Sequence, residues 1–264
     1  MTIDFSNMRS LGLRRFPLGM NHLKDFTALN SELAEFLKPY AIHDVSFIDE
    51  DFKGFDLGNL WTTAGDSGST EFAIPATALL GGAVTGATGT TDDNAISIRG
   101  KAIWKGDNNA GMAVRFKTSA ITDFSFEIGF IDAVTDPTLP VITDVDTPAS
   151  GNGASDIAVV HMDTDQALKT MAFVVDGVTS GMTTTKSNLG TLTPTAATYM
   201  WVCVQLVGDR AHVIIDDNKD SNHYKAIDAK IEGGTLVMPW MYFRTRVTTT
   251  RTIDIDKILV WGDN

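Results

Sequence analysis

From residue 45 onward, hydrophobic and polar residues alternate with a period of two, or short apolar runs stand between turn-forming residues. Both patterns are typical of β-strands, because successive side chains of a strand point to opposite faces of its sheet. About a dozen such segments follow one another without a helical period, which predicts an all-β protein built as an antiparallel two-sheet sandwich. The expected strands are Val45–Phe52, Glu71–Ile74, Ala95–Trp104, Met112–Lys117, Phe124–Phe130, Ile157–Met162, Thr170–Val175, Met200–Val207, Ala211–Ile215, Leu236–Arg246 and Thr252–Trp261, with a weaker one near Leu79–Thr85.

Turn-forming residues separate these segments. Gly208-Asp209 predicts a two-residue hairpin, because glycine adopts the positive φ that such turns require, and Asp176-Gly177 predicts a similar turn. Stretches rich in Gly, Thr and Asp predict surface loops at Gly65–Thr70 and Gly81–Asn94. A longer loop is expected at Val134–Ser155, which contains three prolines.

The first 44 residues follow a different pattern. Glycines and prolines interrupt residues 1–20, which predicts an extended arm. Residues 23–38 repeat apolar side chains at spacings of three and four, which predicts one short amphipathic helix that ends before Pro39. We therefore divide the chain into an arm with its helix, residues 1–44, and a sandwich, residues 45–264. Periodicity leaves open whether the helix packs on its own sandwich or on a neighbouring subunit. The apolar stripe of the helix consists of Phe26, Leu29, Leu33 and Phe36.

Charge is divided unevenly between these two parts. The chain has a formal net charge of −12, yet residues 1–44 contain five basic and five acidic side chains, so the sandwich carries the whole deficit. We expect no nucleic-acid partner, because phosphate recognition depends on clustered Lys and Arg. The apolar stretches are too short to span a membrane, and we expect no membrane partner. The first residues lack the apolar core of a signal peptide, so we expect synthesis in a cytoplasm.

One pair of carboxylates could belong to a catalytic site. Asp254 and Asp256 stand two residues apart on one expected strand, and a glycosidase needs two such carboxylates. The isoleucines that alternate with them, however, indicate that the opposite face of the strand is the buried one. The simplest interpretation is that the aspartates belong to a solvated face. The chain also contains no G-x-S-x-G motif and no phosphate-binding loop. We therefore expect a protein that is not an enzyme.

Metal-ligand patterns are incomplete. Asp216–Asn222 places oxygen ligands at alternate positions, as the first part of a calcium loop does. Ser221 nevertheless occupies the position of the required glycine, and Ile227 that of the bidentate glutamate. Asp92–Asn94 and Asp107–Asn109 are interpreted as turns first and as calcium ligands second. We therefore expect no cofactor. Calcium is the one ion for which the sequence contains a partial ligand pattern.

The remaining chemistry-bearing residues are scattered. The histidines show no metal-binding spacing, and we expect each of them at or near the surface. Cys203 lies in an apolar run and is expected to be a buried structural thiol. Trp61 and Trp261 flank turns and are the better candidates for an exposed sugar-stacking platform, whereas the strand-borne tryptophans are expected in the core. The histidines are His22, His43, His161, His212 and His223, and the strand-borne tryptophans are Trp104, Trp201 and Trp240.

Three pairs of stretches carry a family likeness: Phe47–Phe52 with Leu60-Trp61, Ala113–Phe116 with Phe126–Asp132, and Pro239–Thr245 with Ile253–Trp261. Over residues 45–264 the chain resembles the concanavalin A-like jelly rolls, of lectin or laminin-G type, in tailed-phage structural proteins. The resemblance implies a jelly roll on the exterior of a capsid, as a decoration or cement protein, or in a fibre. The Glu-x-Asp-x-x-Glu motif of the related glucanases is missing, which agrees with a protein that is not an enzyme.

We predict from these features a virion structural protein that decorates the outer surface of a capsid. Its partners would be the major capsid protein and other copies of itself, as a homotrimer. The alternative is a carbohydrate-binding module of a head or tail fibre, with a glycan as its partner. A polysaccharide-degrading enzyme is a third hypothesis, which rests on the fold and on Asp254 and Asp256. The expected capsid-contacting residues are Phe5, Met8, Arg9, Leu11, Arg14, Arg15 and Phe16.

Overall fold

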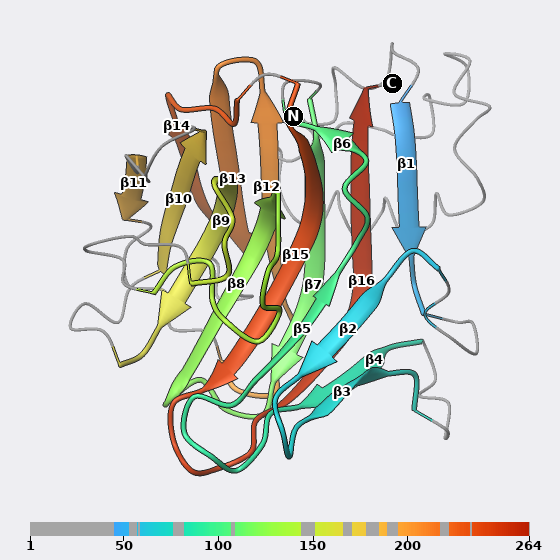
Figure 1. Cartoon of the computed structure of the whole chain (residues 1–264), viewed down its shortest axis with the longest axis vertical. Coiled ribbons are helices and arrows are strands. Elements are labelled where there is room, and N and C mark those ends of the chain that lie inside the picture. The colour runs from blue at the N-terminus through green and yellow to red at the C-terminus, as the bar shows by residue number, and fades with distance from the viewer. Residues whose placement is uncertain are drawn as a thin grey trace.

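Two antiparallel sheets packed face to face form a concanavalin A-like jelly-roll sandwich, as the alternating pattern predicts (Figure 1). No helix occurs in the described residues, so none there could cross a membrane. The predicted arm and helix of residues 1–44, with their proposed contact residues, lie outside this part of the chain. The computed structural model describes residues 45–52, 57, 59–75, 82–106, 109–143, 151–165, 171–177, 185–188, 195–216, 222–232 and 234–263.

Sixteen strands lie within these residues, and every pairing between them is antiparallel. Their bounds are β1 Val45–Glu50, β2 Thr62–Gly65, β3 Thr70–Ala73, β4 Val84–Ala87, β5 Ala95–Arg99, β6 Trp104–Lys105, β7 Gly111–Thr118, β8 Phe124–Ile131, β9 Asp156–Asp163, β10 Met171–Gly177, β11 Thr185–Asn188, β12 Met200–Val207, β13 Arg210–Asp216, β14 Asn222–Ile227, β15 Leu236–Thr245 and β16 Thr252–Asp263.

Each sheet combines strands that are distant in the sequence. The first sheet has the order β14-β13-β12-β7-β16-β4-β3, and β1 pairs with the C-terminal half of β16. The second sheet has the order β11-β10-β9-β8-β15-β5-β2, and β6 pairs with the start of β15. In Figure 1 the blue β1 lies beside the red β16, so the first described strand is joined to the last.

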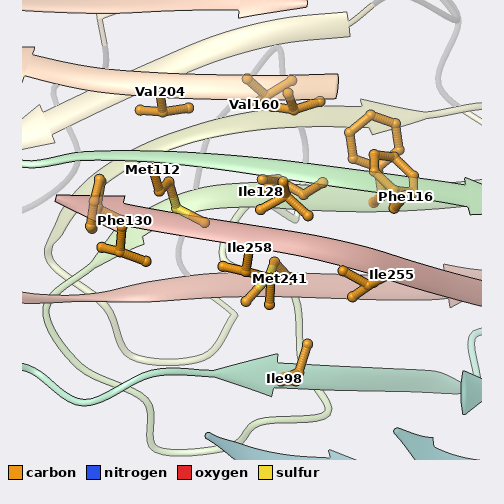
Figure 2. Close-up of a cluster of buried hydrophobic side chains, with 14 of the residues drawn as sticks. Ile98, Met112, Phe116, Ile128, Phe130, Val160, Val204, Met241, Ile255 and Ile258 are labelled. Carbon is orange, nitrogen blue, oxygen red and sulfur yellow. The ribbon is translucent and has the colours of Figure 1, made fainter. Parts of the chain in front are cut away.

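The hydrophobic core lies between the two sheets. Figure 2 shows side chains from β7, β12 and β16 of the first sheet and from β5, β8, β9 and β15 of the second meeting in this layer. Phe116 of β7 lies 5.3 Å, between ring centroids, from both Phe126 of β8 and Phe243 of β15. These aromatic contacts connect the sheets directly, because Phe116 belongs to one sheet and its two partners to the other.

Most of the predicted strands are confirmed, and so is the Gly208-Asp209 hairpin. It joins β12 to β13 with Val207 paired to Arg210, and Gly208 has a φ of +57°. The strands that sequence patterns missed are β2, β11 and β14, each at an edge of a sheet. An edge strand contacts one neighbour only, so it needs fewer buried side chains and shows a weaker alternation.

Three local predictions were wrong. The expected strand Ala95–Trp104 divides into β5 and β6, because Pro239 opposite Gly100 has no N–H to continue the ladder. The expected loop Gly81–Asn94 contains β4, which pairs with the long strand β16 and begins inside the weaker strand expected near Leu79–Thr85. Asp176-Gly177 is not a turn, since both residues still pair with β9.

Candidate functional site

The outer face of the first sheet carries a polar patch beside the start of β12. We call the set Arg115, Lys117, Tyr199, Trp201, Asp254 and Asp256 the Tyr199 face. Alternation places them there, because their sequence neighbours Val114, Phe116, Met200 and Ile255 are buried in the core between the sheets. The pairing of β7 with β16 sets Lys117 opposite Asp254, and the pairing with β12 sets Arg115 opposite Trp201.

Two ion pairs cross between β7 and β16 in this patch. Arg115 Nη1 lies 2.7 Å from Asp256 Oδ2, and Lys117 Nζ lies 3.2 Å from Asp254 Oδ2. Thr85 on β4 donates a hydrogen bond of 2.7 Å to the other oxygen of Asp254. The side chains of Arg115 and Lys117 are still 40% and 31% exposed. Donors and acceptors thus lie side by side at the surface.

An aromatic ring lies against both cations. The guanidinium carbon of Arg115 is 4.6 Å from the centroid of the Tyr199 ring, and Lys117 Nζ is 4.9 Å from it. Both distances are within the range of a cation–π attraction. Tyr199 and Trp201 are only partly buried, so each presents some aromatic surface to solvent. The arrangement therefore combines aromatic surface with paired charges.

A β-bulge explains the position of Asp256. The register between β16 and β7 shifts between Ile255 and Lys257, so Asp256 is the extra residue of the bulge. The core periodicity consequently moves from Ile255 to Ile258, both of which are buried. Asp254 and Asp256 lie on the outer face as predicted, but their side chains are only 18% and 17% exposed, with each carboxylate held by a cation.

Partial burial changes the acidities in the Tyr199 face. Burial raises the pKa of Asp256 above its ordinary value, although the Arg115 charge opposes this. Burial also raises the pKa of the Tyr199 phenol, and the negative charge of Asp256 adds to the effect. Burial lowers the pKa of Lys117, but the hydrogen bond to Asp254 and the attraction to Tyr199 outweigh it, so the net pKa is raised.

A second polar cluster is fully buried on the outer side of the second sheet. The Glu127 carboxylate accepts hydrogen bonds from the backbone N–H groups of Val141 (2.8 Å) and Ile142 (2.7 Å) and from Trp240 Nε1 (3.1 Å). His161 Nδ1 lies 3.2 Å from the same carboxylate. The prediction of a surface position for His161 was therefore wrong. The cluster fastens the long loop to the sheet and is closed to solvent, so its role is structural.

A third cluster joins arginines and aspartates at one end of the sandwich. Asp163 is fully buried and accepts from Arg244 Nη2 at 2.9 Å and from Arg246 Nε at 3.0 Å. Asp93, in the predicted Asp92–Asn94 turn, forms an ion pair with Arg246. The Asp93 carboxylate thus has a cation within the protein as its partner. Among the described residues, His, Cys, Asp and Glu side chains form no group of three that could hold a metal ion.

The tryptophans lie differently from the prediction. Trp61 and Trp261 were expected to be exposed, but they are 6% and 2% exposed. A Cβ on Gly111 would overlap the Trp261 ring, so this glycine makes room for the indole. Trp104 and Trp240 are buried as predicted, whereas Trp201 is only partly buried.

The remaining predicted residues have mixed outcomes. Cys203 is buried as predicted, and burial raises the pKa of its thiol to about 12, so it is unreactive at neutral pH. Most of the partial calcium pattern between Asp216 and Asn222 lies outside the described residues, as do Asp107 and Asn108. The Tyr199 face as a whole was missed, although Arg115 and Lys117 interrupt an apolar strand in a way that could have drawn attention to it.

Comparisons with known proteins identify the fold but no family. No protein-family profile matches the sequence, and no curated protein gives a significant match. The fold is similar to that of a protein of unknown function, SO2946 from Shewanella oneidensis MR-1, with a TM-score of 0.54, 15% identity and coverage of 87% of this chain and 93% of that one.

Two further similar structures are a carbohydrate recognition domain and a sugar-bound protein. The carbohydrate recognition domain of Emp47p gives a TM-score of 0.56 at 11% identity, with coverage of 83% of this chain and 97% of that one. The exoplasmic/lumenal domain of VIP36, in a Ca2+/Man2-bound form, gives 0.51 at 11% identity, with coverage of 83% and 87%. At these identities the likeness establishes the lectin-like jelly-roll fold alone.

Proposed function

We propose that this chain is a carbohydrate-binding protein without catalytic activity. The observation that carries the proposal is the shared sandwich of this chain and the carbohydrate recognition domain of Emp47p. The solvent-facing chemistry of the Tyr199 face supports it. Similar folds host many functions, so the proposal depends on the site as much as on the fold.

The residues of the Tyr199 face match the two chemistries of a sugar. The apolar C–H face of a pyranose ring packs on aromatic surface, which Tyr199 and Trp201 supply. Its hydroxyl groups donate to carboxylates and accept from cations, and here Asp254 and Asp256 lie beside Lys117 and Arg115. A few convergent polar groups around an apolar surface are typical of small-molecule sites.

The absence of catalysis is part of the proposal. Asp254 and Asp256 are each paired with a cation on β7, so neither carboxyl group stands unengaged as a proton donor would. A glycosidase needs one protonated carboxyl to donate to the leaving oxygen. Incubation with neutral polysaccharides should therefore release no reducing sugar. If the native protein releases reducing sugar and a double Asp254→Asn, Asp256→Asn variant does not, the proposed absence of catalysis is wrong.

A glycan array with the full chain tests the proposal. We expect binding to a restricted set of saccharides, with dissociation constants in the micromolar to millimolar range from isothermal titration. Because VIP36 has a Ca2+/Man2-bound form, each titration is run with calcium and with EDTA. If no saccharide binds under either condition, the proposed function is wrong.

Capsid decoration is a second candidate, favoured by the charge division in the sequence. A neutral segment of residues 1–44 precedes a sandwich that carries the −12 charge, as expected for an anchor and a displayed body. Deletion of residues 1–20 should abolish binding to capsids while the sandwich stays folded. Normal decoration by the truncated protein would exclude this candidate. The residues of this anchor, 1–44, lie outside the part of the chain that the structure describes.

A further inference from the structure

We propose that the Tyr199 face selects uncharged saccharides over acidic ones. This inference rests on the proposed carbohydrate function and specifies its site and ligand class. The face contains two cations and two carboxylates, arranged as the pairs Arg115–Asp256 and Lys117–Asp254. Its local charge is therefore zero, and no cation of the face lacks a carboxylate beside it.

An acidic sugar would gain little attraction from these cations, because a carboxylate of the protein already balances the charge of each one. Asp256 already lies 2.7 Å from Arg115, within the range of a strong charge-assisted hydrogen bond. A uronate or sialate would also approach two aspartates, and the net charge of −12 would repel it at longer range. A neutral hydroxyl meets no such opposition, because it accepts from a cation and donates to a carboxylate at the same time.

The ring of Tyr199 fixes where the sugar would lie. Arg115 and Lys117 both contact this ring, so the aromatic surface adjoins the two ion pairs. A pyranose that packs on Tyr199 would direct its hydroxyl groups toward Asp254 and Asp256. Selectivity among neutral hexoses would then depend on the positions of their hydroxyl groups, because the carboxylates accept and the cations donate at fixed positions.

The test compares neutral and acidic probes on the full chain and its variants. Titrations use mannobiose, maltose and lactose as neutral probes, with sialyllactose and digalacturonate as acidic ones. We expect native protein to bind at least one neutral probe more tightly than either acidic probe. Tyr199→Ala should weaken that binding by about tenfold, whereas Tyr199→Phe should keep most of it because the ring is retained.

Removal of one carboxylate should reverse the selectivity. Asp254→Asn leaves Lys117 without its partner, so the face becomes cationic and acidic probes should gain affinity as neutral ones lose it. The matched control is Asp228→Asn, which removes the same charge from the exposed Arg210–Asp228 pair. Tyr199 directly precedes β12, whereas Arg210 lies in the hairpin at the opposite end of that strand. The control should bind as native protein does.

The outcomes separate this inference from the proposed function. If the array finds glycans but Tyr199→Ala and Asp254→Asn bind them as native protein does, the chain is a carbohydrate-binding protein whose site lies elsewhere, and the inference is overturned. Preference of native protein for the acidic probes overturns it too. Thermal unfolding of each variant shows whether a loss of binding reflects a loss of folding, and Tyr199→Phe keeps the ring if Tyr199→Ala does not fold.

Discussion

At the scale of single residues, Glu127 makes the most demanding contacts in the described structure. Its two oxygens serve three N–H donors and adjoin His161, all without access to solvent. A glutamine has one acceptor oxygen and places an NH2 group against donors. We expect Glu127→Gln to lower the free energy of unfolding by about 3 kcal/mol, measured by urea denaturation.

An exposed glutamate provides the control for Glu127→Gln. Glu71 on β3 is exposed and accepts one hydrogen bond, from Thr63. Glu71→Gln should change the free energy of unfolding by less than about 0.5 kcal/mol. Hydrogen exchange at the amides of Val141 and Ile142 should accelerate in Glu127→Gln alone. Equal stability of the two variants would mean that the buried carboxylate does not hold the loop.

Two aspartates should give opposite pH dependences of stability. Burial raises the pKa of Asp256, so folded protein binds this proton more tightly than the unfolded chain does. Its stabilising contribution is present below the unfolded pKa and is lost as the pH rises through the folded pKa. A hydrogen bond from Lys230 lowers the pKa of Asp209. That contribution is present above the unfolded pKa and is lost as the pH falls through the folded one.

Chemical denaturation across a pH series measures both effects. The stability advantage of native protein over Asp256→Asn should shrink as the pH rises above about 4, and its advantage over Asp209→Asn should shrink as the pH falls below about 4. Salt should reduce the effect at the exposed Asp209 more strongly. The same sign at both positions would contradict the assigned causes of the pKa shifts.

At the scale of elements, the sequence predicts the long buried strands well, whereas it misses the edge strands β2, β11 and β14. β8 and β9 are buried along their whole length, so their apolar runs are unmistakable. The edge strand β2 consists of Thr62, Thr63, Ala64 and Gly65, none of them buried. Such a segment has no apolar alternation to find. It is recognised as a strand only by its pairing with β5, which depends on the folded sheet.

The candidate site shows the same limit of sequence patterns. Alternation alone places Asp254 on the outer face of β16 and Lys117 on the outer face of β7. That they meet follows from the register of two strands far apart in the chain, and the bulge at Asp256 shifts that register. Local patterns therefore predicted the face of Asp254 and Asp256, but long-range pairing decided which residues became their neighbours.

The glycine of β7 opposite Trp261 gives a prediction about element packing. Gly111→Ala would place a methyl group inside the indole of Trp261, so either the ring or β16 must move. We expect a loss of about 1–3 kcal/mol in the free energy of unfolding and a shift of tryptophan fluorescence. A second change, Trp261→Phe, should restore part of this loss by shortening the ring. No recovery in the double variant would show that the two residues are not coupled.

At the scale of the whole molecule, both sheets share one core, so the sandwich should unfold as a unit. Phe116 lies between the sheets and contacts Phe126 and Phe243 on the opposite side. Phe116→Ala should cost about 3–5 kcal/mol, because it leaves a cavity between two sheets that cannot both close on it. The loss should appear equally in each spectroscopic probe of unfolding.

Two spectroscopic signals test whether the two sheets unfold together. Near-ultraviolet circular dichroism reports aromatic packing, far-ultraviolet circular dichroism reports strands, and the two transitions should move together in Phe116→Ala. The control is Leu236→Ala, which truncates a side chain that is 47% exposed and should shift neither by much. Separated transitions would mean that the sheets unfold independently. The Tyr199 face, built from β7, β12 and β16 of one sheet, would then be able to persist after the other sheet had opened, and sugar binding would outlast the aromatic signal.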